Sequence, residues 1–202
     1  VTDPAGREAG LPRRPRWHGA VVLGLYAVVF IALAAGSYTG NLTVTAGTGA
    51  NTITVGNGTN IITGGGGADI LTGGTGSDTF NFASAVNLGA ATTIAGGAGN
   101  DTLNIADTAV AATAGFALPS GFTATSIETL NVTTNGSIGI AATAFDVSGI
   151  TGLTKFAGVA AGDGTTDTNV KAANTTDVSL TAAAAAKVTE LGGKAVSVTG
   201  GA

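Results

Sequence analysis

Short β-prone runs alternate with clusters of Gly, Asn, Asp, Ser and Thr along most of this chain. Within residues 46–104, one large apolar residue recurs in each nine-residue unit: Ile53, Ile62, Leu71, Phe80 and Leu103. A single apolar side chain per unit cannot bury itself, so successive units are expected to stack and share a narrow core. The pattern therefore predicts an all-β fold, a right-handed parallel β-roll or β-solenoid in which two units form one coil.

The nine-residue units agree closely, position by position. They read AGTGANTIT, VGNGTNIIT, GGGGADILT and GGTGSDTFN over residues 46–81, and GGAGNDTLN over residues 96–104. The second and fourth positions hold Gly47 and Gly49, Gly56 and Gly58, Gly65 and Gly67, Gly74 and Gly76, and Gly97 and Gly99. The sixth position holds Asn51, Asn60, Asp69, Asp78 and Asp101. Paired glycines permit turns with positive φ, so each unit is expected to be a glycine turn followed by a short strand.

The sixth-position side chains are candidate ligands of a metal ion. With two units per coil, equivalent turns are 18 residues apart in sequence and about 4.8 Å apart in space. Carboxylates this close repel one another, and a cation between them reverses the sign of the interaction. Calcium suits such a slot because it accepts about six to eight oxygen ligands, including backbone carbonyl oxygens. The alternative is a metal-free solenoid in which Asp and Asn only satisfy turn amides.

The repeat resembles G-G-x-G-x-D-x-U-x, the motif of the RTX (repeats-in-toxin) calcium-binding β-roll proteins. The last three units match it fully, whereas the first two lack the leading glycine and carry Asn in place of Asp. The resemblance implies calcium ions held by the glycine turns, with Asn51 facing Asp69 and Asn60 facing Asp78. Five additional residues precede the last unit, so Asp101 is expected to reach the edge of Asp78 if these residues loop out.

The N-terminal segment, residues 1–36, has a different character. It begins with a basic stretch that holds all four arginines, followed by an uncharged apolar run over residues 20–35. The run is shorter than the roughly 20 residues of a membrane span, and Ala32-Leu33-Ala34 has the small-x-small pattern of a signal-peptide cleavage site. A hydrophobic helix is predicted here, either an export signal or an anchor; a buried helix or a stretch foreign to the native unit are the other interpretations. Because the sequence opens with Val and ends after two glycines without a capping element, it is expected to be a fragment.

The β-prone pattern continues beyond the repeat region of residues 40–105. Within residues 106–202, short runs occur at 129–132, 138–140, 145–147, 153–156, 178–180 and 195–198. They favour a continuation of the solenoid, although a sandwich is also compatible with them. Residues 182–191 are the one helix candidate outside the N-terminal segment, because they are alanine-rich and followed by two glycines. A strand remains an alternative there.

Composition excludes several functional classes. From Gly40 onward the chain has ten acidic residues, four lysines and no arginine, so it is a poor ligand for nucleic acid. The only histidine, His18, adjoins the apolar run, which leaves no His-Glu-x-x-His helix or histidine-based triad. The chain lacks cysteine and therefore disulfides and thiolate metal sites. We expect no enzymatic activity, and membrane contact only through the N-terminal apolar run if it is not cleaved.

A second resemblance concerns the biological setting. The segment SIETLNV at residues 126–132, in a chain rich in Ala, Thr and Gly, resembles bacterial S-layer and related type I-secreted surface proteins. It implies a secreted calcium-binding structural module that self-associates into a surface array or binds other cell-surface components. The alternative is the C-terminal repeat region of a secreted hydrolase or toxin whose catalytic domain lies elsewhere.

Overall fold

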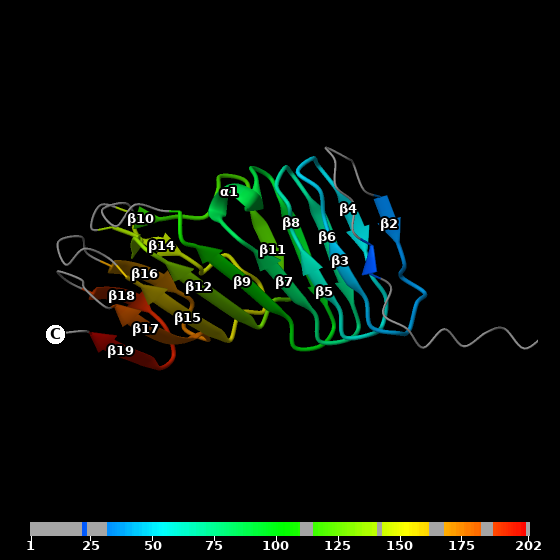
Figure 1. Ribbon diagram of the computed structural model, residues 1–202. Helices are drawn as coiled ribbons and strands as arrows, with labels where there is room; N and C mark the ends of the chain where they lie inside the picture. Colours follow the sequence, from blue (N-terminus) through cyan, green and yellow to red (C-terminus); the bar gives the residue numbers. More distant parts are fainter. Residues whose placement is uncertain are drawn as a thin grey trace, which may run out of the picture.

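The computed structural model of the protein is an elongated parallel β-solenoid (Figure 1). It describes residues 22–23, 32–109, 115–140, 143–161, 168–182 and 188–200. One nine-stranded sheet runs along the molecule in the order β1-β3-β5-β7-β9-β12-β15-β17-β19. A five-stranded sheet (β2-β4-β6-β8-β11), a three-stranded sheet (β14-β16-β18) and the pair β10-β13 supply the other strands. All strand pairings are parallel among the described strands, which confirms the predicted all-β solenoid.

Strand length in the nine-stranded sheet increases from three residues in β3 and β5 to six in β9, β12, β15 and β17. The nine-stranded sheet consists of β1 (Val22–Leu23), β3 (Thr43–Thr45), β5 (Ile61–Thr63), β7 (Thr79–Phe82), β9 (Thr102–Asp107), β12 (Thr129–Thr134), β15 (Lys155–Ala160), β17 (Asp177–Ala182) and β19 (Val196–Gly200). The other strands are β2 (Ala32–Ala34), β4 (Thr52–Thr54), β6 (Ile70–Gly74), β8 (Thr93–Gly97), β10 (Gly115–Phe116), β11 (Thr123–Thr125), β13 (Ser137–Ile138), β14 (Phe145–Asp146), β16 (Thr168–Ala172) and β18 (Val188–Gly192).

Strand register follows the nine-residue repeat. Ile62 of β5 pairs with Phe80 of β7, 18 residues later, and Phe80 pairs with Leu103 of β9. Ile53 and Leu71 are paired in the same way in the five-stranded sheet. All five side chains are buried, with at most 1% of their surface exposed. The eighth-position apolar residue of each unit therefore faces the shared core, as the repeat predicts.

The additional residues between the fourth and fifth units loop out without disturbing this register. They lie between β7 and β8, where residues 85–88 form the short helix α1 (Ala85–Leu88). Thr79 still pairs with Thr102, so the turn that ends in Asp101 stacks on the turn that ends in Asp78. Asp101 thus returns to the same side of the solenoid as Asp78, as the sequence predicts.

The core widens beyond the repeat. Strands β9, β12, β15 and β17 have six residues each and bury alternate residues, which places three inward-facing residues in each strand. Phe145 lies between Phe116 and Phe156, with ring centroids 5.2 and 5.7 Å apart. The six-residue strands of this part therefore present more inward-facing positions to the core than the three-residue strands of the first repeats.

The N-terminal helix predicted for residues 20–35 is not confirmed. The two parts of this segment that the structure describes, β1 and β2, are strands that pair with β3 and β4, and the other residues lie outside the described ranges. Within the described ranges, we find no helix long and apolar enough to span a membrane.

The helix candidate at residues 182–191 is wrong where the structure describes it. Residues 188–192 form strand β18, which pairs with β16. Parallel pairing in a growing stack outweighs the local preference of alanine for a helix, because tertiary context commonly overrides propensity. The β-prone runs at 129–132, 145–147 and 178–180 coincide with β12, β14 and β17.

Candidate metal site

The glycine turns of the repeat stack directly on one another. A Cβ atom added to Gly74 would meet the carbonyl oxygen of Gly56, and one added to Gly97 would meet that of Gly74. In the same way, a Cβ atom added to Gly76 would meet the Gly58 carbonyl oxygen, and one added to Gly99 would meet that of Gly76. Gly74 and Gly97 also have φ angles of 135° and 106°, which side chains disfavour. Glycine is therefore required at these positions both by backbone conformation and by close approach between coils.

Equivalent turns of the first and third units stack on the opposite edge. A Cβ atom at Gly65 would meet the carbonyl oxygen of Gly47, and one at Gly67 would meet that of Gly49. Asn51 and Asp69 follow these turns, whereas Asn60, Asp78 and Asp101 follow the turns of the other edge. The structure thus brings the predicted site residues together in two rows. We call the row of Asn60, Asp78, Asp101 and Glu128 the Asp78 edge, and the row of Asn51, Asp69 and Thr92 the Asp69 edge.

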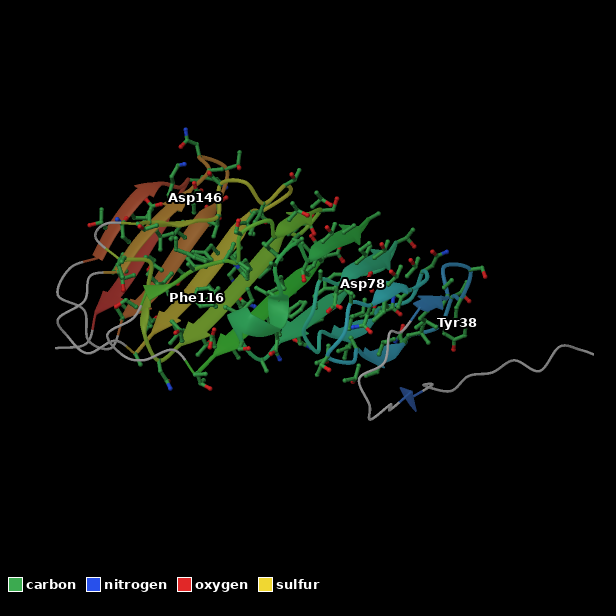
Figure 2. All side chains as sticks on the ribbon, turned by 90° about the horizontal axis from the view of Figure 1, so that it is seen from above. Tyr38, Asp78, Phe116 and Asp146 are labelled. Carbon is green, nitrogen blue, oxygen red and sulfur yellow. The ribbon has the colours of Figure 1, made fainter. Side chains whose placement is uncertain are left out.

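Each sixth-position side chain of the Asp78 edge accepts a hydrogen bond from the coil before it. Asn60 Oδ1 accepts from the Leu42 amide at 2.9 Å, Asp78 Oδ1 from the Asn60 amide at 2.8 Å, and Asp101 Oδ1 from the Asp78 amide at 2.7 Å. The Asn60, Asp78 and Asp101 side chains are at least 99% buried. One oxygen of every side chain is therefore committed to holding successive coils together (Figure 2 marks Asp78 within the stack).

The second polar atom differs between Asn and Asp. The Asn60 side-chain nitrogen, Nδ2, donates to the carbonyl oxygens of Gly56 and Gly58 at 3.1 and 2.8 Å. It also donates to Asp78 Oδ1 at 2.7 Å. Asn51 makes the corresponding contacts with Gly47, Gly49 and Asp69. The side-chain nitrogen of asparagine thus places a donor among three oxygen acceptors.

Aspartate has no donor to offer at that place. Because Asp78 Oδ1 makes the same backbone contact as Asn60 Oδ1, its other oxygen, Oδ2, corresponds to Asn60 Nδ2. Within the described residues, Oδ2 of Asp69, Asp78 and Asp101 is buried and has no hydrogen-bond partner. A buried carboxylate oxygen without a donor is costly, which makes these atoms candidates for contact with a cation.

Other oxygens lie close to the unpaired ones. A Cβ atom added to Gly73 would contact both Asp78 Oδ2 and the Gly96 carbonyl oxygen. One added to Gly96 would contact both Asp101 Oδ2 and the Ser126 carbonyl oxygen. Carboxylate and carbonyl oxygens are the ligands that calcium takes in proteins. The donor set therefore fits a calcium ion, and the residues that would hold it are Asp78 and Asp101 with carbonyls of the glycine turns.

The raised pKa values of the buried aspartates also favour a bound cation at these turns. Burial raises the pKa of Asp101 to about 6; the hydrogen bond from the Asp78 amide opposes this, and the negative charges of Asp78 and Glu128 add to it. Burial also raises the pKa of Asp69 and of Asp78, although hydrogen bonds from Asn51 and Asn60 lower it in part. These carboxylates are destabilised as anions unless a positive charge compensates them.

The Asp69 edge is less charged. Asp69 Oδ1 accepts from the Asn51 amide at 2.9 Å, and the Asp69 amide donates to Thr92 Oγ1 at 3.2 Å. The Thr92 hydroxyl is also within hydrogen-bonding distance of the carbonyl oxygens of Gly67 and Leu88. Thr92 thus takes the place of a carboxylate in the coil after Asp69, so this edge offers one carboxylate where the other offers a series.

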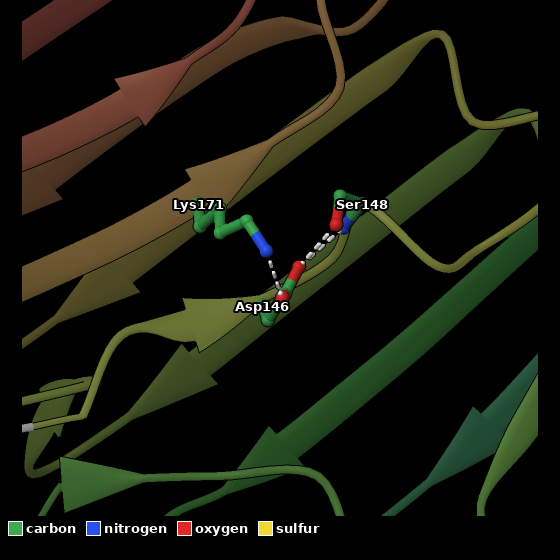
Figure 3. Close-up of polar contacts among 3 residues, drawn as sticks. All are labelled: Asp146, Ser148 and Lys171. Carbon is green, nitrogen blue, oxygen red and sulfur yellow. Dashed lines mark hydrogen bonds and ion pairs between the residues drawn. The ribbon is translucent and has the colours of Figure 1, made fainter.

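Asp146, outside the repeat, shows how an aspartate is satisfied by protein groups alone. Asp146 of β14 forms an ion pair with Lys171 of β16 at 2.7 Å and accepts from the Ser148 hydroxyl and amide (Figure 3). Its side chain is about half exposed, at 46%. The lysine and the serine hydroxyl hold the pKa of Asp146 below its usual value, although partial burial acts against them. Both its oxygens have partners, whereas Oδ2 of the buried aspartates at the turns has none among the described residues.

Glu128 is the member of the Asp78 edge that the sequence reasoning missed. Thr102 pairs with Thr129, so Asp101 and Glu128 stand at the same place in successive coils. Glu128 Oε2 accepts from the Asp101 amide at 2.7 Å. The sequence does contain a pattern that could have identified it, because Asp78, Asp101 and Glu128 begin the similar segments DTFNF, DTLNI and ETLNV. Their asparagines also form a ladder, in which Asn104 donates to Asn81 at 2.9 Å and Asn131 to Asn104 at 2.8 Å.

Within the described ranges, no three Asp, Glu or His side chains gather around one point. A cation at these turns would therefore take most of its ligands from backbone carbonyl oxygens. Stacked glycine turns that present carbonyls and one carboxylate per coil, on a parallel solenoid, define a calcium-binding β-roll.

Comparison with known families agrees with this class. The family model described as the RTX calcium-binding nonapeptide repeat, in four copies, matches residues 45–80 and 89–104. This region thus carries RTX-type calcium-binding repeats, and the parallel solenoid of the described residues is compatible with a β-roll. RTX repeats are a structural calcium-binding module and are not catalytic. No curated protein and no solved structure matches the chain.

Proposed function

We propose that the chain is a calcium-stabilised structural module of a secreted bacterial cell-surface protein, of the S-layer or adhesin type. The observation that carries the calcium role is the set of buried, unpaired Oδ2 atoms of Asp69, Asp78 and Asp101. A divalent cation supplies the positive charge that these oxygens lack and cross-links successive coils through them.

The ion positions follow from the place of the asparagine side-chain nitrogen. Asn60 Nδ2 lies among Gly56, Gly58 and the next carboxylate; one coil further, the equivalent oxygens belong to Gly74, Gly76 and Asp101. An ion at this place would bridge Asp78 and Asp101. On the other edge, an ion would be held by Asp69 with the carbonyls of Gly65 and Gly67.

The first turns of each edge have a different part in this proposal. Gly47, Gly49 and Asn51, and likewise Gly56, Gly58 and Asn60, already satisfy one another through the side-chain nitrogen. We infer that these turns extend the same ladders without requiring an ion of their own. Calcium then acts on the coils from Asp69 to Asp101.

The folding response to calcium tests this role. In chelator, the glycine-rich coils retain uncompensated carboxylates and a thin core, so less favourable free energy remains to offset the entropy of ordering the chain. Circular dichroism of the chain in chelator and then in about 5–10 mM calcium should show β-structure increasing with calcium, since extracellular sites bind at about 10⁻⁴–10⁻³ M. Identical β-rich spectra in both conditions would refute the calcium role.

The surface-array role is tested separately. It is supported by the continuation of the solenoid well beyond the repeats in one uninterrupted sheet, and by the resemblance of SIETLNV to S-layer proteins. Light scattering and negative-stain microscopy with calcium should reveal ordered assemblies. Monomers at all concentrations, together with a hydrolase or toxin domain in the full open reading frame, would instead favour the repeat region of a secreted hydrolase or toxin.

A further inference from the structure

Glu128 lies outside the residues that match the RTX repeat, which end at 104, yet it continues the row of carboxylates. We propose that Glu128 completes a further calcium site, which it shares with Asp101 and the turn formed by residues 96–101. This site rests on the calcium role proposed above and adds a ligand from a coil without the nonapeptide.

The hydrogen bonding of Glu128 reproduces that of the aspartates. Glu128 Oε2 accepts from the Asp101 amide at 2.7 Å, as Asp101 Oδ1 accepts from the Asp78 amide at 2.7 Å. The carboxylate of Glu128 thus reaches the place that the sixth-position aspartate occupies in the coils before it. Two carboxylates of successive coils are thereby held close to each other, and among the residues that the structure describes neither of them forms an ion pair.

Asp101 supplies the second, independent observation. Its side chain is 99% buried, and its Oδ2 has no hydrogen-bond partner within the described residues. A Cβ atom added to Gly96 would contact both this oxygen and the Ser126 carbonyl oxygen, so the two oxygens lie on the same side of Gly96. A buried anionic oxygen thus faces another oxygen from the Glu128 coil. This arrangement is unfavourable in the protein interior unless a cation lies between the two oxygens.

The remaining ligands would come from the glycine turn of Asp101. Gly97 and Gly99 occupy the positions of Gly56 and Gly58, whose carbonyls surround the Asn60 side-chain nitrogen. In the Glu128 coil only Ser126 and Ile127 precede the glutamate after strand β11, so the glycine turn is missing there. The longer side chain of glutamate compensates for this shorter turn by reaching back to Asp101.

The series ends at this point. Thr129 pairs with Lys155, so the next coil carries Thr154 at the position of Glu128. The Thr154 amide and hydroxyl both donate to the Glu128 carbonyl oxygen, at 3.0 Å each. The Asp78 edge thus holds Asp78, Asp101 and Glu128 in sequence and then changes to a neutral residue, which makes Glu128 the terminal ligand.

Calcium stoichiometry tests the proposal. The variant Glu128→Gln keeps an oxygen that can accept from the Asp101 amide but removes the charge, and Asp177→Asn makes the same carboxylate-to-amide change at an exposed position of β17 as a control. Isothermal titration of the whole chain with calcium should give one ion fewer for Glu128→Gln than for the control and the unaltered chain. Circular dichroism of the variants without calcium compares their folds, so that a lost ion can be told apart from a lost fold.

The outcomes separate the two proposals. If Glu128→Gln binds as many ions as the control while Asp78→Asn binds fewer, the Glu128 site is wrong and the calcium role stands. If the unaltered chain binds no calcium, the proposed function itself fails, and the Glu128 site with it.

Discussion

Asn60 and Asp78 occupy the same place in successive coils, and the Asn60 side-chain nitrogen donates to Asp78 Oδ1 at 2.7 Å. The same nitrogen donates to the carbonyls of Gly56 and Gly58. In the coil of Asp78, an oxygen stands where this nitrogen would be, and it has no hydrogen-bond partner within the described residues. The exchange of one NH₂ group for one oxygen thus distinguishes a turn that is complete by itself from a turn that requires a cation.

Replacing the donor should create a calcium requirement. In Asn60→Asp, the side-chain oxygen would face Gly56, Gly58 and Asp78, so the turn would contain uncompensated oxygens. The variant should bind one more calcium ion and be less stable in chelator by about 1–3 kcal/mol. Asn57→Asp makes the same chemical change at an exposed position of the same turn and should do neither. Equal stoichiometry for the two variants would show that the asparagine nitrogen does not stand in for an ion.

Replacing Asp78 by asparagine should remove the calcium requirement of its turn. In Asp78→Asn, the new side-chain nitrogen could donate to Gly74, Gly76 and Asp101, as Asn60 donates in its own coil. We expect higher stability in chelator, by about 1–3 kcal/mol, together with the loss of an ion. Urea unfolding in chelator, with Asp177→Asn on the exposed end of β17 as the control, measures the first effect. A destabilised Asp78→Asn variant in chelator would contradict the equivalence of the two turns.

Acid should partly replace calcium. The pKa of Asp101 is raised to about 6 in the folded state, above the ordinary value of 3.8. The folded state therefore binds more protons than the unfolded state between these values, and stability falls as pH rises through about 6. In chelator, the chain should resist urea better at pH 5 than at pH 7.5. Asp101→Asn should lose much of this difference; a stability that rises with pH in chelator would show that the carboxylates are already compensated.

The C-terminal coils should respond differently. Phe156 is fully buried and its ring lies 5.7 Å from that of Phe145. Phe156→Ala should cost about 3–5 kcal/mol, as is usual for a large aromatic residue removed from a core, by the same amount in calcium and in chelator. Val159→Ala, at a residue 45% exposed on the same strand, should have little effect. A loss confined to one of the two conditions would mean that calcium also governs this part of the core.

The repeat region is the part of the fold that the sequence predicts best. The spacing of Ile62, Phe80 and Leu103 determines strand register because the eighth position of every unit holds a large apolar residue that is buried. The return of Asp101 to the edge of Asp78 follows from the same constraint. Beyond residue 105 the sequence predicts strands but not their partners, since Phe116, Phe145 and Phe156 are brought together at irregular spacing.

The candidate site was less predictable in its details. Which atom of an asparagine faces a neighbouring carboxylate depends on the donors and acceptors around it in three dimensions. The Leu42 amide and the glycine carbonyls decide this for Asn60, and no local sequence pattern contains them. Glu128 was missed because its coil lacks the glycine turn, even though ETLNV repeats the strand pattern of DTLNI.

The most direct measurement is an anomalous difference map from crystals grown with calcium. The account predicts peaks between Asp78 and Asp101, beside Asp69, and between Asp101 and Glu128, with none at the side-chain nitrogens of Asn51 and Asn60. A peak at the Asn60 turn, or no peak between Asp78 and Asp101, would contradict the claim that calcium binds where the asparagine donor is missing.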